Sequence, residues 1–363
     1  MTEDRTALSD DQVLRAVAVL HLGDPGGLGE TPHGEALVHA AESERLLGPL
    51  YEASISGAVE LTDAAKQLLV ERLKATMLWC LHLETRLIEL RAEFAAAGGV
   101  DTLLLKGSAV AYLDEDDPIL RSSSDVDLLV RGAHIDRAVS VLERLGATRP
   151  WPQRRSGFDR RFAKSVTMTM LDGVEIDLHR SLCDGVHGHR IPLPELFADA
   201  EEFTIGGERI GALCRPHRML HAAYHAMLGS SAPNLLSLRD LAGYLAAPDL
   251  GPDRVVPIAE RWRGEAVLHL AVRSTLDALN VSAPAWQNWA ETTAVDPPEQ
   301  AIVDRQRREG SSFGVAKLDL WRELGPRDKA AYARALLWPS TGHLSARRQR
   351  RSDPFRALLR SRG

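Results

Sequence analysis

The sequence predicts an α+β fold in which a small mixed β-sheet lies between an N-terminal helical layer and a C-terminal helical domain. Apolar residues recur at helical spacing over residues 1–98, and short apolar runs alternate with glycine-containing turns over residues 99–215. Helical spacing returns over residues 216–340. Strands gathered in one stretch of chain, with helices before and after it, are typical of the α+β class. An arginine-rich segment, residues 341–363, is expected to form a flexible basic tail.

In the first region, helix-capping residues precede the helical segments. Ser9, followed by two aspartates, is placed to cap a first helix, and a second helix is expected over residues 36–47. Thr62 is placed to cap a third, long helix, whose leucines recur at spacings near three and four until Gly98-Gly99 ends it. We interpret this region as a packing layer in which the long helix has one apolar face.

In the second region, short apolar runs and turn dipeptides predict the sheet. Asp172-Gly173 and Gly206-Gly207 each separate two apolar runs, which is a strong hairpin signal. The predicted strands cover residues 100–105, 126–130, 162–171, 174–178, 203–205 and 209–213, with helices at 109–113 and 134–145.

In the third region the strand signals stop and helical spacing resumes after Pro216, a residue favoured at helix starts. Residues 282–298 contain three prolines and are expected to form a connection. Helices are predicted at residues 217–228, 235–245, 255–262, 266–279, 299–308, 316–324 and 326–337.

Charge and cysteine content exclude several classes of protein. The chain has a net charge of −6, but residues 341–363 hold seven arginines and one aspartate, so the tail is +6 and the remainder is −12. An acidic body is unsuited to general binding of duplex DNA, which requires a basic surface. Three widely separated cysteines without a CxxC pair make a disulfide framework or structural zinc site unexpected. No leader sequence and no apolar run of the ~20 residues needed for a membrane span is visible, so a cytoplasmic protein is expected.

Two aspartates at the start of a predicted strand form the first chemical signal. Asp125 and Asp127 are two residues apart, so their side chains point to the same face of the strand. Two carboxylates this close repel each other unless a cation lies between them. Magnesium, which prefers oxygen ligands and is often held by carboxylates together with substrate phosphates, suits such a pair.

A further aspartate lies in an otherwise apolar strand later in the chain. Asp177 stands between Ile176 and Leu178, and Glu175 shares its face. If this strand lies beside the first acidic strand, Asp177 supplies a third carboxylate. Three carboxylates hold two metal ions, one to activate an attacking hydroxyl and one to neutralise leaving phosphates.

The turn Lys106-Gly107-Ser108 adds a candidate phosphate site. A glycine after a strand, followed by a hydroxyl residue at a helix start, presents backbone N–H groups to a phosphate, and Lys106 adds positive charge. Alone, such a turn is more often an ordinary strand-to-helix connection. Its order before the two acidic strands is what points to nucleotide chemistry.

This order resembles the DNA polymerase beta-like nucleotidyltransferase superfamily, whose signature is hG[GS], then Dh[DE]h, then h[DE]h, where h is hydrophobic. The blocks at residues 105–108, 124–130 and 174–179 look more closely like a bacterial family of uncharacterised nucleotidyltransferases. The likeness continues into the helical part through Pro216-His217, His225 and Leu238-Arg239-Asp240-Leu241, and covers roughly residues 35 to 340. It implies that residues 99–215 are a nucleotidyltransferase catalytic core.

The resemblance also implies a reaction and a role for each matched residue. An acceptor hydroxyl or phosphate attacks the α-phosphorus of an NTP such as ATP, an NMP is transferred, and pyrophosphate leaves. Two Mg²⁺ ions are implied, with Mn²⁺ as the alternative. Asp125, Asp127 and Asp177 would be the catalytic metal ligands, and Lys106, Gly107 and Ser108 would hold phosphates.

Other polar residues have two interpretations each. Arg121 either touches phosphate or forms a salt bridge with the acidic residues 114–117, and Asp240 is expected to orient an arginine or histidine. His217, His221 and His225 share one helix face; packing and capping are favoured over metal binding, although His225 matches the family's histidine and is a candidate contact for nucleotide or acceptor.

The remaining candidates receive mainly structural interpretations. His179 is expected on the strand face opposite Asp177, with a structural hydrogen-bonding role. His187 and His189 are expected in a mobile loop that borders the acceptor site. Tyr112 and Trp151 are favoured as core residues over base-stacking ones, and Cys183 lacks the partners of a nucleophile.

The acceptor is the main open question. A small molecule or a modified natural-product peptide is favoured, because the body is acidic, the helical region is large enough to enclose a pocket, and members of the resembled family occur near natural-product genes. An enzyme acting on RNA or protein is the alternative, supported only by the basic tail, whose simpler interpretation is a solvated end. A catalytically inactive nucleotide-binding module is the third hypothesis, and the intact set of aspartates argues against it.

Overall fold

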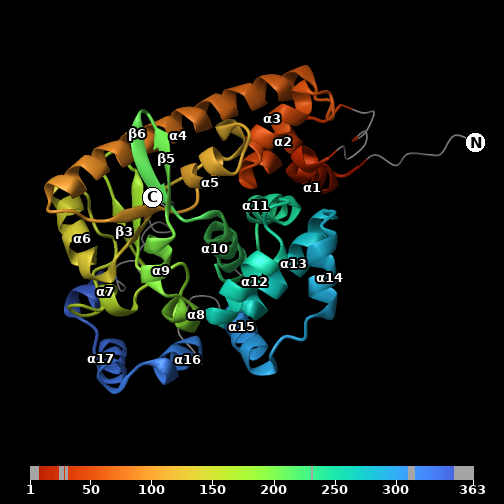
Figure 1. Cartoon of the computed structure of the whole chain (residues 1–363). Helices are drawn as coiled ribbons and strands as arrows, with labels where there is room; N and C mark the ends of the chain where they lie inside the picture. Colours follow the sequence, from red (N-terminus) through yellow and green to blue (C-terminus); the bar gives the residue numbers. More distant parts are fainter. Residues whose placement is uncertain (1–7, 24–27, 29–31, 230–231, 310–314, 347–363) are drawn as a thin grey trace, which may run out of the picture.

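The structure is a computed structural model that describes residues 8–23, 28, 32–229, 232–309 and 315–346. It confirms the α+β class, because the strands of one mixed sheet are preceded and followed in the sequence by helices. Figure 1 shows the longest helix, α4 (Asp63–Ala96), running along one side of the molecule from the N-terminal helices to α6 (Ile135–Arg144).

The N-terminal layer consists of α1 (Asp10–Val19), α2 (Glu35–Ser43), α3 (Leu47–Ile55) and α4. Ser9 caps α1 in a reciprocal arrangement with Gln12, and the Thr62 hydroxyl accepts from the Ala65 N–H at the start of α4, so both predicted caps are confirmed. The second predicted helix, over residues 36–47, ends earlier, at Ser43, because a tight turn at Arg45 follows it, and α3 after this turn was not predicted.

Within the described residues, six strands form one sheet in the order β3-β4-β2-β1-β6-β5. The pairs β2–β4 and β1–β6 are parallel, and the other neighbours are antiparallel. Both predicted hairpins are present, with Gly173, Gly206 and Gly207 at positive φ. The strands are β1 (Thr102–Leu104), β2 (Val126–Val130), β3 (Ser165–Thr169), β4 (Glu175–His179), β5 (Glu201–Ile205) and β6 (Glu208–Ala212).

Short helices connect these strands. They are α5 (Ser108–Leu113), the 3₁₀ helices at Pro118–Leu120 and Gly132–His134, α6, α7 (Asp159–Phe162), α8 (Gly185–Arg190) and α9 (Leu193–Ala198). The apolar run expected as one strand over residues 162–171 is shorter, because Phe162 ends α7 and only 165–169 pair in the sheet.

The prediction of a mobile loop around His187 and His189 was wrong. These residues lie in α8, where His187 is fully buried. A Cβ atom at Gly188 would lie 1.9 Å from the carbonyl oxygen of Cys183, so the glycine permits close backbone packing. The segment with Gly185, Gly188 and the two histidines therefore forms a tightly packed helix.

The C-terminal region contains α10 (Arg215–Leu228), α11 (Leu235–Ala246), α12 (Pro252–Arg261), α13 (Glu265–Leu279), α14 (Pro284–Thr292), α15 (Pro297–Glu309), α16 (Val315–Glu323) and α17 (Pro326–Leu337). The connection expected over residues 282–298 was wrong, because it contains α14. Pro284 occupies the first turn of that helix, where its missing N–H costs nothing, and Trp286 is buried.

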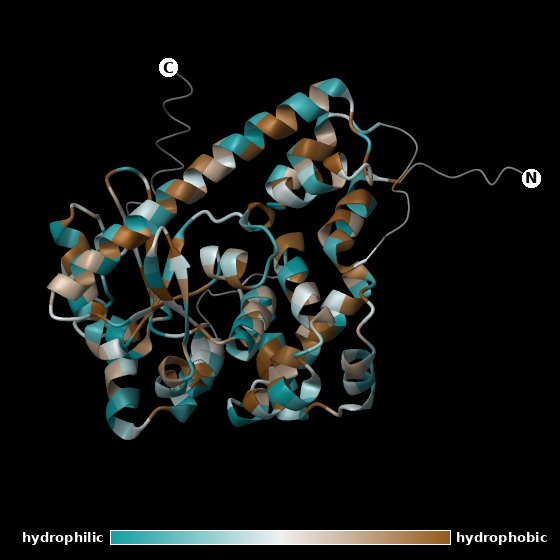
Figure 2. Cartoon of the chain, turned by 45° about the horizontal axis from the view of Figure 1, so that its top comes forward, coloured by the Kyte–Doolittle hydropathy of each residue, from teal (hydrophilic) through white to brown (hydrophobic). Residues whose placement is uncertain are grey.

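Two large apolar clusters hold these parts together. One joins the N-terminal helices α1–α4 to the C-terminal helices α10–α14, so these two regions of sequence share a core. The other lies between the sheet and the helices α4 and α6. Hydrophobic and hydrophilic patches alternate along α4 in Figure 2, as expected for a helix that buries one side.

The basic tail predicted for residues 341–363 lies largely outside the described residues, since 347–363 hold all seven of its arginines. Among the helices that the structure describes, none is long and apolar enough to cross a membrane.

A glycine fixes the distance between the N-terminal layer and the segment before β2. A Cβ atom at Gly48 would lie 2.0 Å from the carbonyl oxygen of Ile119. We therefore expect Gly48→Ala to lower the free energy of unfolding by about 1–3 kcal/mol through overpacking. Denaturant titration measures this. Gly325→Ala is the control, because nothing lies within 4 Å of its added methyl. Equal stability of both variants would contradict the close approach.

Candidate metal and nucleotide site

The parallel pairing of β2 with β4 brings two aspartates together from distant parts of the chain. Asp127 and Asp177 are register partners in this pair. The Asp127 side chain is 4% exposed and that of Asp177 is 25% exposed, so one carboxylate is buried and the other reaches toward solvent. The two acidic strands are therefore neighbours, as was required for Asp177 to join Asp127.

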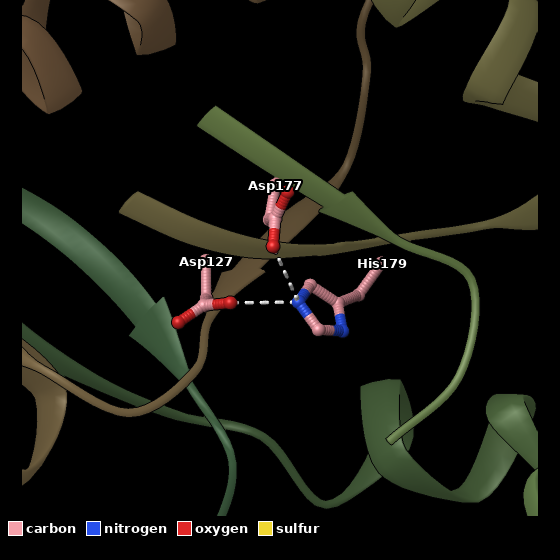
Figure 3. A group of neighbouring side chains, drawn as sticks. All are labelled: Asp127, Asp177 and His179. Carbon is pink, nitrogen blue, oxygen red and sulfur yellow. Dashed lines mark hydrogen bonds and ion pairs between the residues drawn. The ribbon is translucent and has the colours of Figure 1, made fainter. Parts of the chain in front are cut away.

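The imidazole of His179 faces both carboxylates with the same ring nitrogen, as Figure 3 shows. Its Nε2 atom is 2.7 Å from Asp127 Oδ1 and 4.0 Å from Asp177 Oδ2. The prediction that His179 lies on the face opposite Asp177 was wrong, because residues two apart in a strand share a face. The expected hydrogen-bonding role is present, but it acts on the acidic group itself.

Lys106 completes the surroundings of Asp127. It follows β1, which neighbours β2, and its Nζ atom lies 2.9 Å from Asp127 Oδ2. Burial by itself would raise the pKa of Asp127, but the hydrogen bond from His179 and the charge of Lys106 more than offset it and hold the pKa well below its usual value. Asp127 is therefore ionised at neutral pH, with both oxygens engaged.

Asp125 stands one residue before β2, at the edge of this group. Burial, and then repulsion from Asp127, raise the pKa of Asp125, while Lys106 and a hydrogen bond from Ser124 oppose the rise. The Ser124 hydroxyl donates to Asp125 Oδ1 at 3.1 Å. A buried carboxyl with a raised pKa beside another carboxylate is common at functional sites.

The Gly107-Ser108 turn lies against the loop that leads to these aspartates. Gly107 has φ = 51°, and a Cβ atom there would lie 2.5 Å from Ser123 Oγ, so a larger residue does not fit. Ser108 is the first residue of α5, as predicted, and its side chain opposes the rise that burial causes in the pKa of nearby Glu84 of α4.

Glu84 is a residue near this turn that the sequence did not indicate. Burial raises its pKa, and hydrogen bonds from Tyr112 and Ser108 oppose the rise. The Tyr112 hydroxyl donates to Glu84 at 3.2 Å, and the tyrosine is partly exposed, not a core residue. No local pattern distinguishes Glu84 from the other acids of α4, so only the tertiary structure reveals it.

Arg121 is held by Asp240, which confirms that Asp240 orients an arginine. The guanidinium nitrogens Nε and Nη2 donate to the two Asp240 oxygens at 2.8 and 2.9 Å, and both side chains are buried. The salt bridge with residues 114–117, one of the two interpretations of Arg121, is absent from the described ion pairs. Asp114 pairs with Arg218 instead, and Glu115 pairs with Arg239.

The histidines of α10 divide between two surroundings. His221 and His225 line a small cavity together with Lys106, Ser237 and Asp240. Burial, followed by the charge of Lys106, lowers the pKa of both, that of His225 to about 3. Both imidazoles are therefore neutral at neutral pH.

Residues 31–278 match the model of a family described as "Uncharacterised nucleotidyltransferase", which is more than half of the chain. The chain belongs to this family. It is therefore an enzyme of the nucleotidyl-transferring class, whose substrate is a nucleoside triphosphate. Nucleotidyltransferases generally use divalent metals, and Asp127, Asp177 and His179 offer ligand atoms that all lie within 4.8 Å of one another.

A solved structure is also similar to this nucleotidyltransferase. It is the crystal structure of an antigenic nucleotidyltransferase-like protein from Paracoccidioides brasiliensis, with 14% sequence identity and a TM-score of 0.34. The similarity covers 57% of this chain and 97% of the other. No curated protein matches the sequence.

The described residues contain a second group of potential ligand atoms. It consists of Glu195, Asp199 and His217. Arg261 already pairs with Glu195 at 2.8 Å, so this cluster has a cation from the protein itself. His217 packs on Trp262, in keeping with the packing role favoured for it.

Removing the imidazole of His179 tests the charge balance of the site. We expect His179→Leu to lower the free energy of unfolding at neutral pH by on the order of 2–3 kcal/mol, because buried Asp127 loses a hydrogen bond. The pKa of Asp127 is depressed in the folded state, so its contribution is present above the unfolded pKa and is lost as pH falls. The difference between wild type and variant should therefore narrow toward acid pH in denaturant titrations.

The matched control is the same substitution in an Asp127→Asn background. There the carboxylate is gone, and the effect of His179→Leu should depend little on pH. The same pH dependence in both backgrounds would rule out Asp127 as its source.

Proposed function

We propose that this enzyme transfers an NMP from an NTP to a hydroxyl or phosphate of a small molecule or modified peptide, and that Mg²⁺ ions held by Asp125, Asp127 and Asp177 support the transfer. The observation that carries this proposal is the register of β2 and β4, which sets Asp127 opposite Asp177 with Asp125 at the strand start. Two metal ions are proposed, with Mn²⁺ as the alternative.

The donor set fits a hard divalent cation. Carboxylate oxygens are the ligands that Mg²⁺ prefers, and three carboxylates, Asp125, Asp127 and Asp177, face one ammonium, that of Lys106. When bound, the metal ions would neutralise phosphate charge and lower the pKa of the attacking hydroxyl. His179 supports this role by orienting Asp127 through a hydrogen bond, as residues behind metal ligands commonly do.

The residues around the carboxylates supply contacts for the triphosphate. The Lys106 ammonium contacts Asp127, and the residue also lines the small cavity with His221 and His225, so it lies where the acidic group and this cavity meet. Gly107 lets the backbone approach Ser123 closely, and the N–H groups of its turn are proposed to bind a phosphate. Ser108 is proposed to bind phosphate beside it.

His225 is proposed to contact the substrates, whereas Arg121 is proposed to position a loop. A neutral His225 can donate a hydrogen bond to a phosphate or to the acceptor without adding charge. Arg121 is already bonded to Asp240 and to the Ser122 carbonyl oxygen, which favours a role in positioning the loop before Asp125 over direct binding of nucleotide.

The alternative acceptors, RNA or a protein, have less support. Their sequence basis is the basic tail, whose arginines lie outside the described residues. The third hypothesis is an inactive nucleotide-binding module. It has less support, because all three aspartates of the proposed metal site are present and lie near one another. A natural-product acceptor remains our preferred class.

Neutralising the aspartates tests the metal-dependent mechanism. With Mg²⁺, each labelled NTP and candidate acceptors, we expect Asp125→Asn/Asp127→Asn and Asp177→Asn to lower pyrophosphate release by about 10³-fold or more, since charge stabilisation at the transferred phosphate is lost. Chelation of the metal should abolish release by the wild type. Labelled RNA or protein in the same reaction would identify the alternative acceptors.

Glu175→Gln is the matched control, because Glu175 begins the same strand as Asp177 but is exposed. Its activity should equal that of the wild type. If the aspartate variants retained wild-type activity, the metal mechanism would be wrong.

Replacing Lys106 tests both its ion pair with Asp127 and its proposed contact with the triphosphate. We expect Lys106→Met to bind Mn²⁺ several-fold more tightly in the absence of nucleotide, because the ammonium no longer competes for Asp127, and to bind the triphosphate more weakly. Titration of free Mn²⁺ by electron paramagnetic resonance measures the first effect. Lys74→Met, on an exposed position of α4, controls for the loss of charge. Unchanged Mn²⁺ affinity would show that Lys106 does not occupy the metal's place.

A further inference from the structure

The N-terminal helical layer delivers an arginine to the edge of the acidic group. Arg45 lies in the turn between α2 and α3, and its Nη2 atom donates to Ser124 Oγ at 2.9 Å. That hydroxyl in turn donates to Asp125 Oδ1 at 3.1 Å. A guanidinium from a segment 79 residues earlier in the chain is thus two hydrogen bonds from the first aspartate.

The turn that carries Arg45 has a geometry usually served by glycine. Arg45 has φ = 60°, its N–H donates to the Glu42 carbonyl oxygen, and the Leu46 N–H donates to that of Ala41. These two bonds form the common helix-ending motif whose left-handed residue is most often glycine. An arginine is strained there relative to glycine, and what distinguishes Arg45 is the place of its side chain, two hydrogen bonds from Asp125.

The turn is fixed on both sides, which sets the position of the guanidinium. Glu44 accepts a hydrogen bond from the Leu235 N–H at the start of α11, at 2.7 Å. Gly48 packs directly on the Ile119 carbonyl oxygen. The loop that receives Arg45 is also fixed, because the Trp79 indole donates to the Ser124 carbonyl oxygen at 3.2 Å.

The charge of Arg45 has no acidic partner within the described part of the chain. Each described ion pair joins a cation and a carboxylate within 4.0 Å, and Arg45 is in none of them. Its side chain is exposed, and one hydrogen bond to a serine uses one of its five N–H donors. An exposed, unneutralised guanidinium next to a carboxylate site is suited to a polyanion that approaches that site.

We propose that Arg45 binds the non-bridging oxygens of the nucleotide's triphosphate. This rests on the proposed function, because the triphosphate approaches Arg45 only if Asp125 and its neighbours hold the metal that carries it. Arg45 then acts together with Lys106, which contacts Asp127, whereas Arg45 is linked to Asp125 through Ser124. The N-terminal layer thereby contributes a nucleotide-binding residue, in addition to its packing role.

Arg45→Gly tests this without disturbing the turn. Glycine relieves the positive φ, so the thermal midpoint should equal or exceed that of the wild type. Binding of inorganic tripolyphosphate with Mg²⁺, measured by calorimetry, should weaken by about tenfold or more, since an arginine contact with phosphate is lost. In turnover, the KM for NTP should rise more than kcat falls. Tripolyphosphate contains no acceptor, so the measurement distinguishes the triphosphate from an acceptor phosphate.

The chain offers a closely matched control in Arg263. It ends α12 with the same pair of backbone bonds, has φ = 50°, and Arg263→Gly removes the same charge. Its tripolyphosphate affinity should equal that of the wild type. Unchanged affinity in Arg45→Gly, or an equal loss in both variants, would overturn the proposal. Pyrophosphate release that requires Asp125 and Asp127 would still support nucleotidyl transfer in that case, so the two failures are distinguishable.

Discussion

The parallel pairing of β2 with β4 is the constraint on which the rest of the site depends. Strands that run in the same direction in one sheet cannot be joined by a tight turn, so the chain between them must leave the sheet and return. Here it forms α6, α7 and the antiparallel strand β3 before β4 pairs with β2. The resulting register places Asp127 beside Asp177. A shift of one residue would turn one carboxylate to the opposite face of the sheet.

Burial makes this arrangement costly unless positive charge is near. Lys106 arrives from the end of β1 and His179 from the end of β4, so each flanking strand supplies a group that stabilises Asp127. The same principle governs the segment before β2, where Asp114 and Glu115 pair with arginines of α10 and α11 and Arg121 pairs with Asp240 of α11. Because breaking one member of such a buried pair leaves a charge without a partner, these contacts hold the helical region in register with the sheet.

Much of the fold was predictable because its signals are local. Capping residues, apolar spacing and glycine turns lie within a few residues of the elements they define, so α1, α4 and both hairpins were predicted. The failures arose where a local signal has two meanings. Pro284 starts a helix instead of ending one, and Gly188 permits close packing instead of mobility. His179 is a different case, because its spacing of two residues from Asp177 already places both side chains on one face of the strand.

The sequence by itself determined which residues bring carboxylates to the strands of the site, and the order of these residues, through its resemblance to a known family, indicated the class of chemistry. Asp125, Asp127, Asp177 and the turn at Gly107 stand out because polar residues are rare within apolar runs. Only the tertiary structure decided the partners of these residues. Arg121 bonds Asp240, Lys106 bonds Asp127, and Arg45 reaches Ser124 across 79 residues of chain. Ion pairs and hydrogen bonds act over a few ångströms, whereas the packing of apolar faces brings together the segments that form them. The sequence of an apolar face indicates that the face is buried, but it does not indicate which element packs against it.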